Sequence, residues 1–272
     1  MEASGLLQST TLLDFGNPRL KALIAERGWW YLPERERIGA AYDFVRDEIV
    51  FGYNTSDDIP ASQVLADGYG QCNTKSTLLM ALLRSLGIEC RLHGFTIDKA
   101  LQKGAVTGWA YALAPRNILH SWVEVRHQDR WINLEGFILD RRYLAALQQR
   151  FAAHRGPFLG YGVGTPDLKN PPVAWRCDDT YIQRDGINQD FGLFDDPDAF
   201  YARHGANLSG PKRWVFEHVV RHMMNRNVHD IRLAAPVEAP AQAGQASGGP
   251  SAPEAGCQGL DGAIRSRVDV RL

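Results

Sequence analysis

The stretch Gly68-Tyr-Gly-Gln-Cys72-Asn-Thr-Lys-Ser-Thr-Leu-Leu-Met-Ala-Leu-Leu-Arg-Ser-Leu-Gly87 predicts a helix that begins at a cysteine. Its apolar residues recur at helical spacing on more than one side, so we expect the rest of the protein to enclose it. Gly87 suits the position just after a helix end. The N–H groups at a helix N-terminus carry partial positive charge, which favours the thiolate form of a cysteine there. Cys72 is therefore the candidate nucleophile.

Two later segments supply a candidate base and a candidate carboxylate. The first, His120-Ser-Trp-Val-Glu-Val125, alternates as a half-buried strand does, and the second is Trp131-Ile-Asn-Leu-Glu135. Cys72, His120 and Glu135 have the residue types of a triad in which a base activates a nucleophile and a carboxylate orients the base. We therefore predict that these three side chains meet.

The turn between the two segments decides whether they can meet. An even number of turn residues, centred on positions 128–129, places Trp122 opposite Glu135. His120 is then a diagonal neighbour of Glu135 on one face, with about 7–8 Å between the Cβ atoms. An odd number would point Glu135 to the other face, because side chains alternate along a strand. Asp140 is the fallback carboxylate in that case.

The triad predicts acyl transfer through a thioester intermediate. Cys72 attacks a carbonyl carbon, His120 takes the thiol proton and later protonates the leaving group, and Glu135 holds the imidazole in place. The backbone N–H of Cys72 is a candidate donor to the developing oxyanion, and the side chain of Gln71 is a candidate for the second. Water as the acceptor gives hydrolysis and an amine gives transfer, and the residues leave both open.

Working outward, composition excludes several classes of partner. The chain has 272 residues, of which 44% are hydrophobic and 22% charged, and its net charge is −1. A chain this close to neutral has no electrostatic basis for binding nucleic acid or an anionic membrane. No apolar run reaches membrane-spanning length, and the first residues lack the pattern of a signal peptide. We expect a cytoplasmic protein without a nucleic-acid or membrane partner.

The order of elements predicts an α+β fold, with helices first, then the cysteine helix, an antiparallel sheet and further helices. Before the cysteine helix, residues 33–49 show helical spacing. The remaining predicted elements are strands at 90–97, 109–114, 118–126 and 130–137, and helices at 141–151, 196–203 and 211–231. We expect one domain over residues 1–233. Residues 234–272 are rich in Pro, Ala and Gly, which predicts a flexible tail.

Residues 38–140 resemble the transglutaminase-like superfamily, whose members have a papain-like cysteine fold. The resemblance implies that Cys72 is the nucleophile and His120 the base, with Glu135 where the family usually has aspartate. It implies no cofactor, as in bacterial members; animal transglutaminases need calcium, and no EF-hand loop is present. Residues 141–233 then form a helical extension. The matching segments are Ala61-Ser-Gln-Val-Leu-Ala-Asp-Gly-Tyr-Gly-Gln-Cys72, Lys75-Ser76, Leu83-Arg-Ser-Leu-Gly-Ile88, Arg91, His120-Ser-Trp-Val-Glu-Val125 and Trp131-Ile-Asn-Leu-Glu135.

The superfamily includes transglutaminases, peptidases, amidases, amide-forming enzymes and inactive binding modules. The resemblance therefore implies a peptide, a protein or a small amide or thioester as substrate, and an inactive interaction module is the alternative. Trp109 and Tyr111 are candidates either for the wall of a substrate channel or for core packing. His218 and His222 lie four apart without a third ligand, so we interpret them as polar surface and predict no metal.

Overall fold

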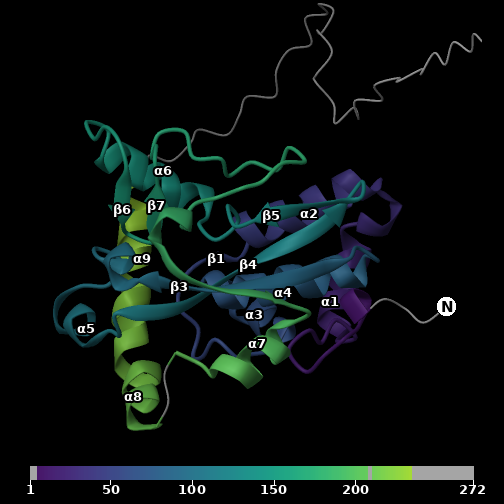
Figure 1. Ribbon diagram of the computed structural model, residues 1–272, viewed down its shortest axis with the longest axis horizontal. Helices are drawn as coiled ribbons and strands as arrows, with labels where there is room; N and C mark the ends of the chain where they lie inside the picture. The colour runs from purple at the N-terminus through teal and green to yellow at the C-terminus, as the bar shows by residue number, and fades with distance from the viewer. Residues whose placement is uncertain (1–4, 208–209, 235–272) are drawn as a thin grey trace, which may run out of the picture. The chain divides into compact units, whose positions relative to one another are not determined.

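The computed structural model describes residues 5–207 and 210–234, and in it helices surround an antiparallel sheet (Figure 1). The predicted α+β class is confirmed. The predicted tail falls outside the described residues from position 235 onward. The helices are α1 (Pro18–Glu26), α2 (Glu34–Asp47), α3 (Ala61–Asp67), α4 (Cys72–Ser85), α5 (Gly108–Leu113), α6 (Arg141–Arg150), α7 (Pro197–His204), α8 (Gly210–Val215) and α9 (Arg221–Leu233). The strands are β1 (Val50–Phe51), β2 (Tyr69–Gly70), β3 (Cys90–Asp98), β4 (Asn117–His127), β5 (Arg130–Leu134), β6 (Phe158–Gly160), β7 (Val163–Thr165) and β8 (Ile187–Phe194).

The main sheet has the strand order β5-β4-β3-β8, and all of its pairs are antiparallel. A two-residue turn joins β4 to β5, and both of its residues, Gln128 and Asp129, have positive φ angles. Such a turn matches the twist of the flanking strands. Val123 pairs with Leu134, so the register continued by one residue brings Glu135 level with Trp122. The predicted even-numbered turn and its register are confirmed.

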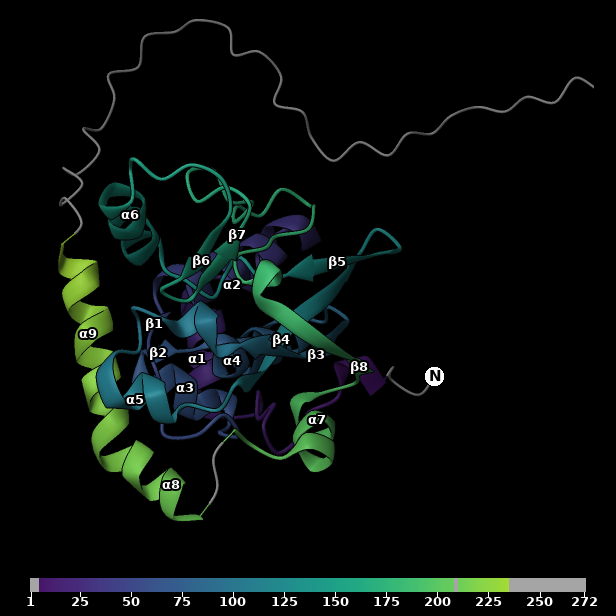
Figure 2. The same ribbon diagram turned by 60° about the vertical axis from the view of Figure 1, so that its left-hand side comes forward.

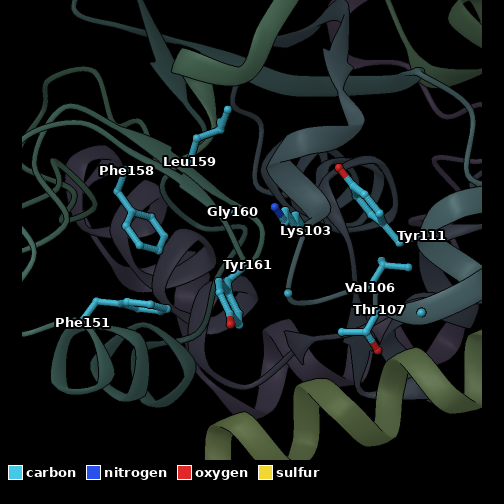
Figure 3. A pocket seen from close by; sticks show the side chains of 11 residues that line it. Lys103, Val106, Thr107, Tyr111, Phe151, Phe158, Leu159, Gly160 and Tyr161 are labelled. Atoms are coloured by element: carbon cyan, nitrogen blue, oxygen red, sulfur yellow. The ribbon is translucent and has the colours of Figure 1, made fainter.

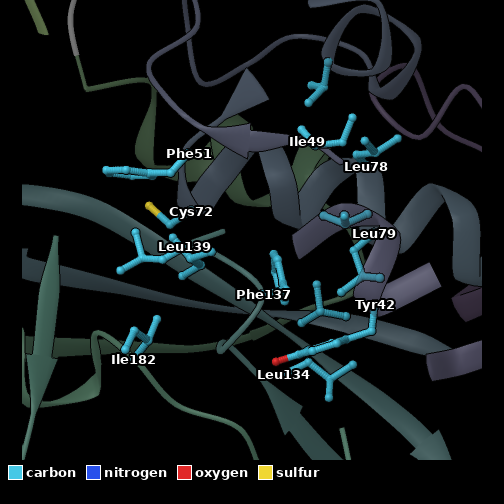
Figure 4. Close-up of a cluster of buried hydrophobic side chains, with 14 of the residues drawn as sticks. Tyr42, Ile49, Phe51, Cys72, Leu78, Leu79, Leu134, Phe137, Leu139 and Ile182 are labelled. Carbon is cyan, nitrogen blue, oxygen red and sulfur yellow. The ribbon is translucent and has the colours of Figure 1, made fainter. Parts of the chain in front are cut away.

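Helix α4 is the centre of the core, as its apolar sequence predicts. Residues 72–84 are all buried, and the helix packs against α2, α3 and β4. The helix ends before Gly87, which has a φ of +74° and provides the left-handed conformation expected there. Cys72 lies at one edge of the apolar cluster, near Phe51 and Leu139 (Figure 4). The helix thus presents its first residue where the core borders on polar groups.

The strand predicted at residues 109–114 is wrong, because this segment forms helix α5. The alternation of large and small residues is compatible with either structure over so short a span. The ammonium group of Lys99 lies at the end of this helix and donates to the carbonyl oxygens of Tyr111, Ala112 and Ala114, at 3.3–3.4 Å. A cation at a helix C-terminus satisfies carbonyls that have no partner within the helix.

Strand β8 was not predicted, because little in its sequence indicates a strand. Its residues alternate poorly, and its pairing with β3 is interrupted by two shifts of register. Gly192 within it has a φ of +80°. Edge strands often carry such irregularities, which discourage pairing with another chain.

The last helical segment agrees with the helix predicted at 211–231. Helix α8, a π-helical turn at Phe216–Val220 and α9 follow one another without interruption and run beside α5 (Figures 1 and 2). A buried ion pair anchors α9, since Arg232 Nη2 lies 2.8 Å from Asp140 Oδ2. The same nitrogen donates to the carbonyl oxygen of Phe51 at 2.7 Å. These contacts connect the C-terminal helix to β1 and to the start of α6.

Candidate active site

The local sequence places Cys72 as the first residue of α4. The hydroxyl of Thr74 accepts a hydrogen bond from the backbone N–H of Gln71 at 3.1 Å, which defines the start of the helix. A Cβ atom at Gly70 would lie 2.7 Å from the Thr74 hydroxyl oxygen, so only glycine fits this close approach. Cys72 is a free thiol with 7% of its surface exposed. Its backbone N–H belongs to the first turn, which has no partners within the helix.

His120 and Glu135 form a fully buried pair. His120 Nε2 lies 2.8 Å from Glu135 Oε1, and neither side chain is exposed to solvent. The second oxygen, Glu135 Oε2, accepts hydrogen bonds from the backbone N–H groups of Ile182 at 2.8 Å, Gln183 at 3.0 Å and Arg184 at 3.1 Å. Because N–H groups can only donate, Oε2 acts only as an acceptor and Oε1 is the oxygen that faces His120. Nε2 of His120 is therefore the protonated nitrogen that donates to Glu135.

The other ring nitrogen of His120, Nδ1, is left for Cys72. It is buried and has no hydrogen-bond partner of normal geometry among residues 5–207 and 210–234. Burial by itself lowers the pKa of His120, but the charge of Cys72 and the interactions of the ring with Cys72 and Glu135 raise it to about 10. The ring is thus held as an imidazolium at neutral pH, next to the sulfur.

Asp140, the fallback carboxylate, has a different place. Its Oδ1 accepts the N–H of Tyr143 at the start of α6, and its Oδ2 accepts the N–H of Phe51, each at 2.9 Å. Burial opposes its ionisation, but the hydrogen bond and charge of Arg232, with these backbone donors, hold the pKa of Asp140 below its usual range. Asp140 thus anchors α6 and α9, and Glu135 is the carboxylate that contacts His120.

Gln71, the candidate second oxyanion donor, has its amide orientation fixed by two neighbours. Its Oε1 accepts the backbone N–H of Asn54 at 3.0 Å, and its Nε2 donates to Asp57 Oδ1 at 3.0 Å. A backbone N–H can only donate and a carboxylate can only accept, so the amide cannot be reversed. One N–H of Nε2 is not used by these two contacts. Gln71 and Cys72 line the same cavity.

Sequence reasoning missed a set of polar residues that surrounds the nucleophile. Besides Gln71, the buried carboxylate of Asp57 accepts hydrogen bonds from Asn73 at 3.2 Å and Asn207 at 2.7 Å. Asn73 also donates to the carbonyl oxygen of Leu119 at 3.0 Å, and the Ser121 hydroxyl donates to Asn73 at 3.0 Å. These bonds attach the start of α4 to β4 on both sides of His120. Asn73 adjoins Cys72 in sequence, whereas Asp57 and Asn207 lie in loops with no recognisable spacing.

Cys72 opens onto a cavity of about 440 Å³. Trp109 lines this cavity. Of the two roles considered for it, wall of a substrate channel or core packing, this position agrees with the first. Tyr111 lines a separate hollow of about 530 Å³, which contains aromatic rings and Lys103 (Figure 3). Val106 lies in the wall of both. Of these two spaces, only the one with Trp109 is lined by a residue of the predicted triad.

The described residues contain no group of three or more His, Cys, Asp and Glu side chains that could hold a metal ion. Nδ1 of His218 lies 2.8 Å from the carbonyl oxygen of Trp214, and Nε2 of His222 lies 3.3 Å from the neighbouring Arg221 guanidinium. Within residues 5–207 and 210–234, no helix combines the length and the apolar character needed to cross a membrane.

Residues 26–136 match the family model of the transglutaminase-like superfamily, which confirms the predicted resemblance for this segment. The match supports a cysteine-dependent enzyme and specifies neither reaction nor substrate. No curated protein matches the chain.

One similar solved structure is a "putative cysteine protease" from Cytophaga hutchinsonii, with 11% sequence identity and a TM-score of 0.40. The similarity covers 79% of this chain and 48% of that one, so the chain spans about half the length of that protein.

Proposed function

We propose that this protein is a cysteine-dependent acyl-transfer enzyme in which Cys72, His120 and Glu135 form the catalytic triad. The observation that carries the proposal is the buried His120–Glu135 pair at 2.8 Å, whose second ring nitrogen is left to Cys72. A purely structural histidine pair has no need of a thiol at the free nitrogen. The raised pKa of His120 keeps the proton on the ring while the sulfur reacts as a thiolate.

The reaction proceeds in two halves. In the first, the Cys72 sulfur attacks the carbonyl carbon of an amide or thioester, and His120 gives its proton to the departing amine or thiol as the carbon–heteroatom bond breaks. This leaves a thioester on Cys72 and a neutral imidazole. In the second, water or an amine attacks the thioester, His120 accepts the proton of the attacking group, and the thiolate leaves. The enzyme returns to its starting state.

The oxyanion of each tetrahedral intermediate needs preorganised donors. The backbone N–H of Cys72 and the remaining N–H of Gln71 Nε2 are the two we assign to it, because Asn54 and Asp57 fix the Gln71 amide. One such donor contributes about 10²–10³-fold to the rate. Glu135 acts through His120, since three backbone N–H groups hold its carboxylate in place.

Alkylation by iodoacetamide tests whether Cys72 is an activated thiolate. Cys90 is the matched control, because it is also a buried free thiol, and burial raises its pKa to about 11. We expect Cys72 to be labelled at least tenfold faster than Cys90 at pH 7, and Cys72→Ala, but not Cys90→Ala, to abolish the fast phase. Equal labelling of the two thiols in the folded protein would overturn the assignment.

Incubation with a peptide library, with and without added amine, separates hydrolysis from transfer by the masses of the products. A mass gain of 18 Da across the two fragments indicates hydrolysis, and a product that carries the amine indicates transfer. A folded protein whose Cys72 forms no acyl adduct and changes no substrate would instead be the inactive interaction module. Cys72→Ala provides the blank for each incubation.

A further inference from the structure

We infer that the cavity beside Cys72 binds the acyl group of the substrate, and that this acyl group is uncharged and apolar. The inference rests on the proposed function, because it takes Cys72 as the residue that becomes acylated. It adds the substrate class, which neither the triad nor the family match specifies. The volume of the cavity, about 440 Å³, falls within the range of small-molecule binding sites.

Three parts of the fold supply apolar walls to this cavity. One is the segment around α5, another is the start of β4, and the third is the C-terminal helical segment. Gln71 and Asn73, the sequence neighbours of Cys72, also line the cavity, and both donate hydrogen bonds to Asp57. An acyl group bonded to the Cys72 sulfur would therefore have its carbonyl among polar groups and its remainder among apolar ones. The apolar lining includes Trp109 and Ala110 on α5, Ile118 on β4, and Phe216, Val220 and Met224 in the C-terminal helical segment.

The two charged side chains that line the cavity, Asp57 and Arg213, already have hydrogen-bond partners. Asp57 accepts hydrogen bonds from the side chains of Gln71, Asn73 and Asn207 and from the backbone N–H of Asn207. Arg213 donates to Glu217 at 2.8 Å. The oxygens of Asp57 are thus occupied by amide donors, Arg213 contacts Glu217, and most of the remaining lining is apolar, so burying a charged group of the acyl chain there is costly. The site therefore disfavours acyl groups that carry a carboxylate or an ammonium.

The C-terminal helical segment contributes wall residues at a regular spacing of four. Phe216 and Val220 come from the π-helical turn, and Met224 follows on α9. π-helical turns are rare in proteins, and those that occur are often found at functional sites. These residues lie outside the segment that matches the transglutaminase-like family. Val219, one position from Val220, is 43% exposed and faces away from the cavity.

Acylation of Cys72 by p-nitrophenyl esters tests the inference on the unmodified protein. Release of p-nitrophenol gives the second-order rate constant for the acetate ester and for the hexanoate ester. Each rate constant is divided by that of the same ester with a small free thiol, which corrects for the ester's intrinsic reactivity. Each buried methylene is expected to raise the rate about fourfold, so we expect the hexanoate to react at least tenfold faster after this correction. N-acetylglycine and N-acetylleucine p-nitrophenyl esters form a second pair, which reveals whether the apolar group is a hydrocarbon chain or an amino-acid side chain.

A preference for the larger member of either ester pair supports the inference, and no preference in both pairs overturns it. If acetate itself fails to acylate Cys72, as shown by peptide mass mapping, the proposed function fails instead. The two failures are thus distinguishable.

Val220→Trp and Val219→Trp provide matched variants on neighbouring helix positions. Val220→Trp fills the cavity and should lower the hexanoate-to-acetate ratio at least tenfold, whereas Val219→Trp should leave the ratio unchanged. Ala110→Leu narrows the cavity from α5 and should lower the ratio in the same direction, should Val220→Trp fail to fold. Equal ratios in the unmodified protein and in a folded cavity variant would contradict the assignment.

Discussion

Two histidines on neighbouring strands of the sheet contact carboxylates at almost the same distance, and only one of them lies next to a thiol. His93 on β3 has its ring nitrogens 2.9 Å from Glu124 and 2.9 Å from Asp190. His120 on β4 lies 2.8 Å from Glu135. Because Phe95 pairs with His120 and lies two residues from His93, both rings project from one face of the sheet.

The difference between the two histidines lies in the second ring nitrogen. Both nitrogens of His93 are used by carboxylates, which fixes the ring as a charged cross-link between strands. His120 uses one nitrogen for Glu135 and keeps the other beside Cys72. A histidine can accept and return a proton only if one nitrogen is free to meet the reacting group. The comparison therefore supports the proposed catalytic role of His120, whereas the contacts of His93 connect strands.

Replacement of each histidine by asparagine gives the largest contrast. We expect His120→Asn to lower the rate of Cys72 acylation by p-nitrophenyl acetate by up to about 10⁴-fold, because the general acid–base group is lost. His93→Asn should change it less than about threefold, since His93 contacts no group of the triad. Release of p-nitrophenol measures both rates. Equal losses in the two variants would show that the rings act only through the stability of the sheet.

The carboxylates give the next contrast. In Glu135→Gln, the three N–H donors of residues 182–184 require an oxygen, so the amide NH₂ must face His120. His120 then has to present a bare Nε2 and carry its proton on Nδ1, where it can no longer accept the thiol proton. We expect a loss of roughly a hundredfold or more in acylation. Glu124→Gln, the matched change beside His93, should leave the rate near that of the unmodified protein.

The pH dependence of stability should report the raised pKa of His120. The folded pKa of His120 is about 10 against an ordinary value of 6.5, so its bound proton stabilises the folded state. This contribution is complete below about pH 6.5 and is lost as the pH rises through 10, with a slope of up to about 1.4 kcal/mol per pH unit. Urea unfolding between pH 7 and 9 should show the slope, and His120→Asn should remove it. A slope that persists in that variant must come from another group.

The smallest effect on stability is expected at Asp190, the more exposed of the two carboxylates that contact His93. Burial alone lowers the pKa of His93, but its bonds to Glu124 and Asp190 raise it above the usual range. Asp190→Asn should bring this pKa down, measured by NMR, and should change the free energy of unfolding by less than about 1 kcal/mol, because Asp190 is largely exposed. The acylation rate should not change. A large loss of rate would show that the two histidines are coupled.

Local sequence predicted the parts of the site that local geometry decides. The start of α4 follows from Gly70 and the helical spacing after Cys72, and the level of Glu135 follows from the parity of one turn. The helix at 108–113 escaped prediction because the alternation of residues over so short a span is compatible with either a strand or a helix.

The surroundings of the triad could not be read in the same way. The donors to Glu135 are backbone N–H groups, which every residue type except proline has, so residue identity does not reveal them. Asp57 and Asn207 reach the site from loops 150 positions apart. The cavity likewise depends on Phe216, Val220 and Met224, which reach it from outside the family match.

Peptide mass mapping after brief exposure to p-nitrophenyl acetate tests the central claim most directly. The arrangement of Cys72, His120 and Glu135 predicts one acetyl group per chain, carried by Cys72, which forms together with an equal amount of p-nitrophenol. Treatment of the adduct with water or an amine should release the acetyl group and restore the thiol. A folded protein that shows no acetyl group on Cys72, or carries it on Cys90 at the same rate, would contradict the claim.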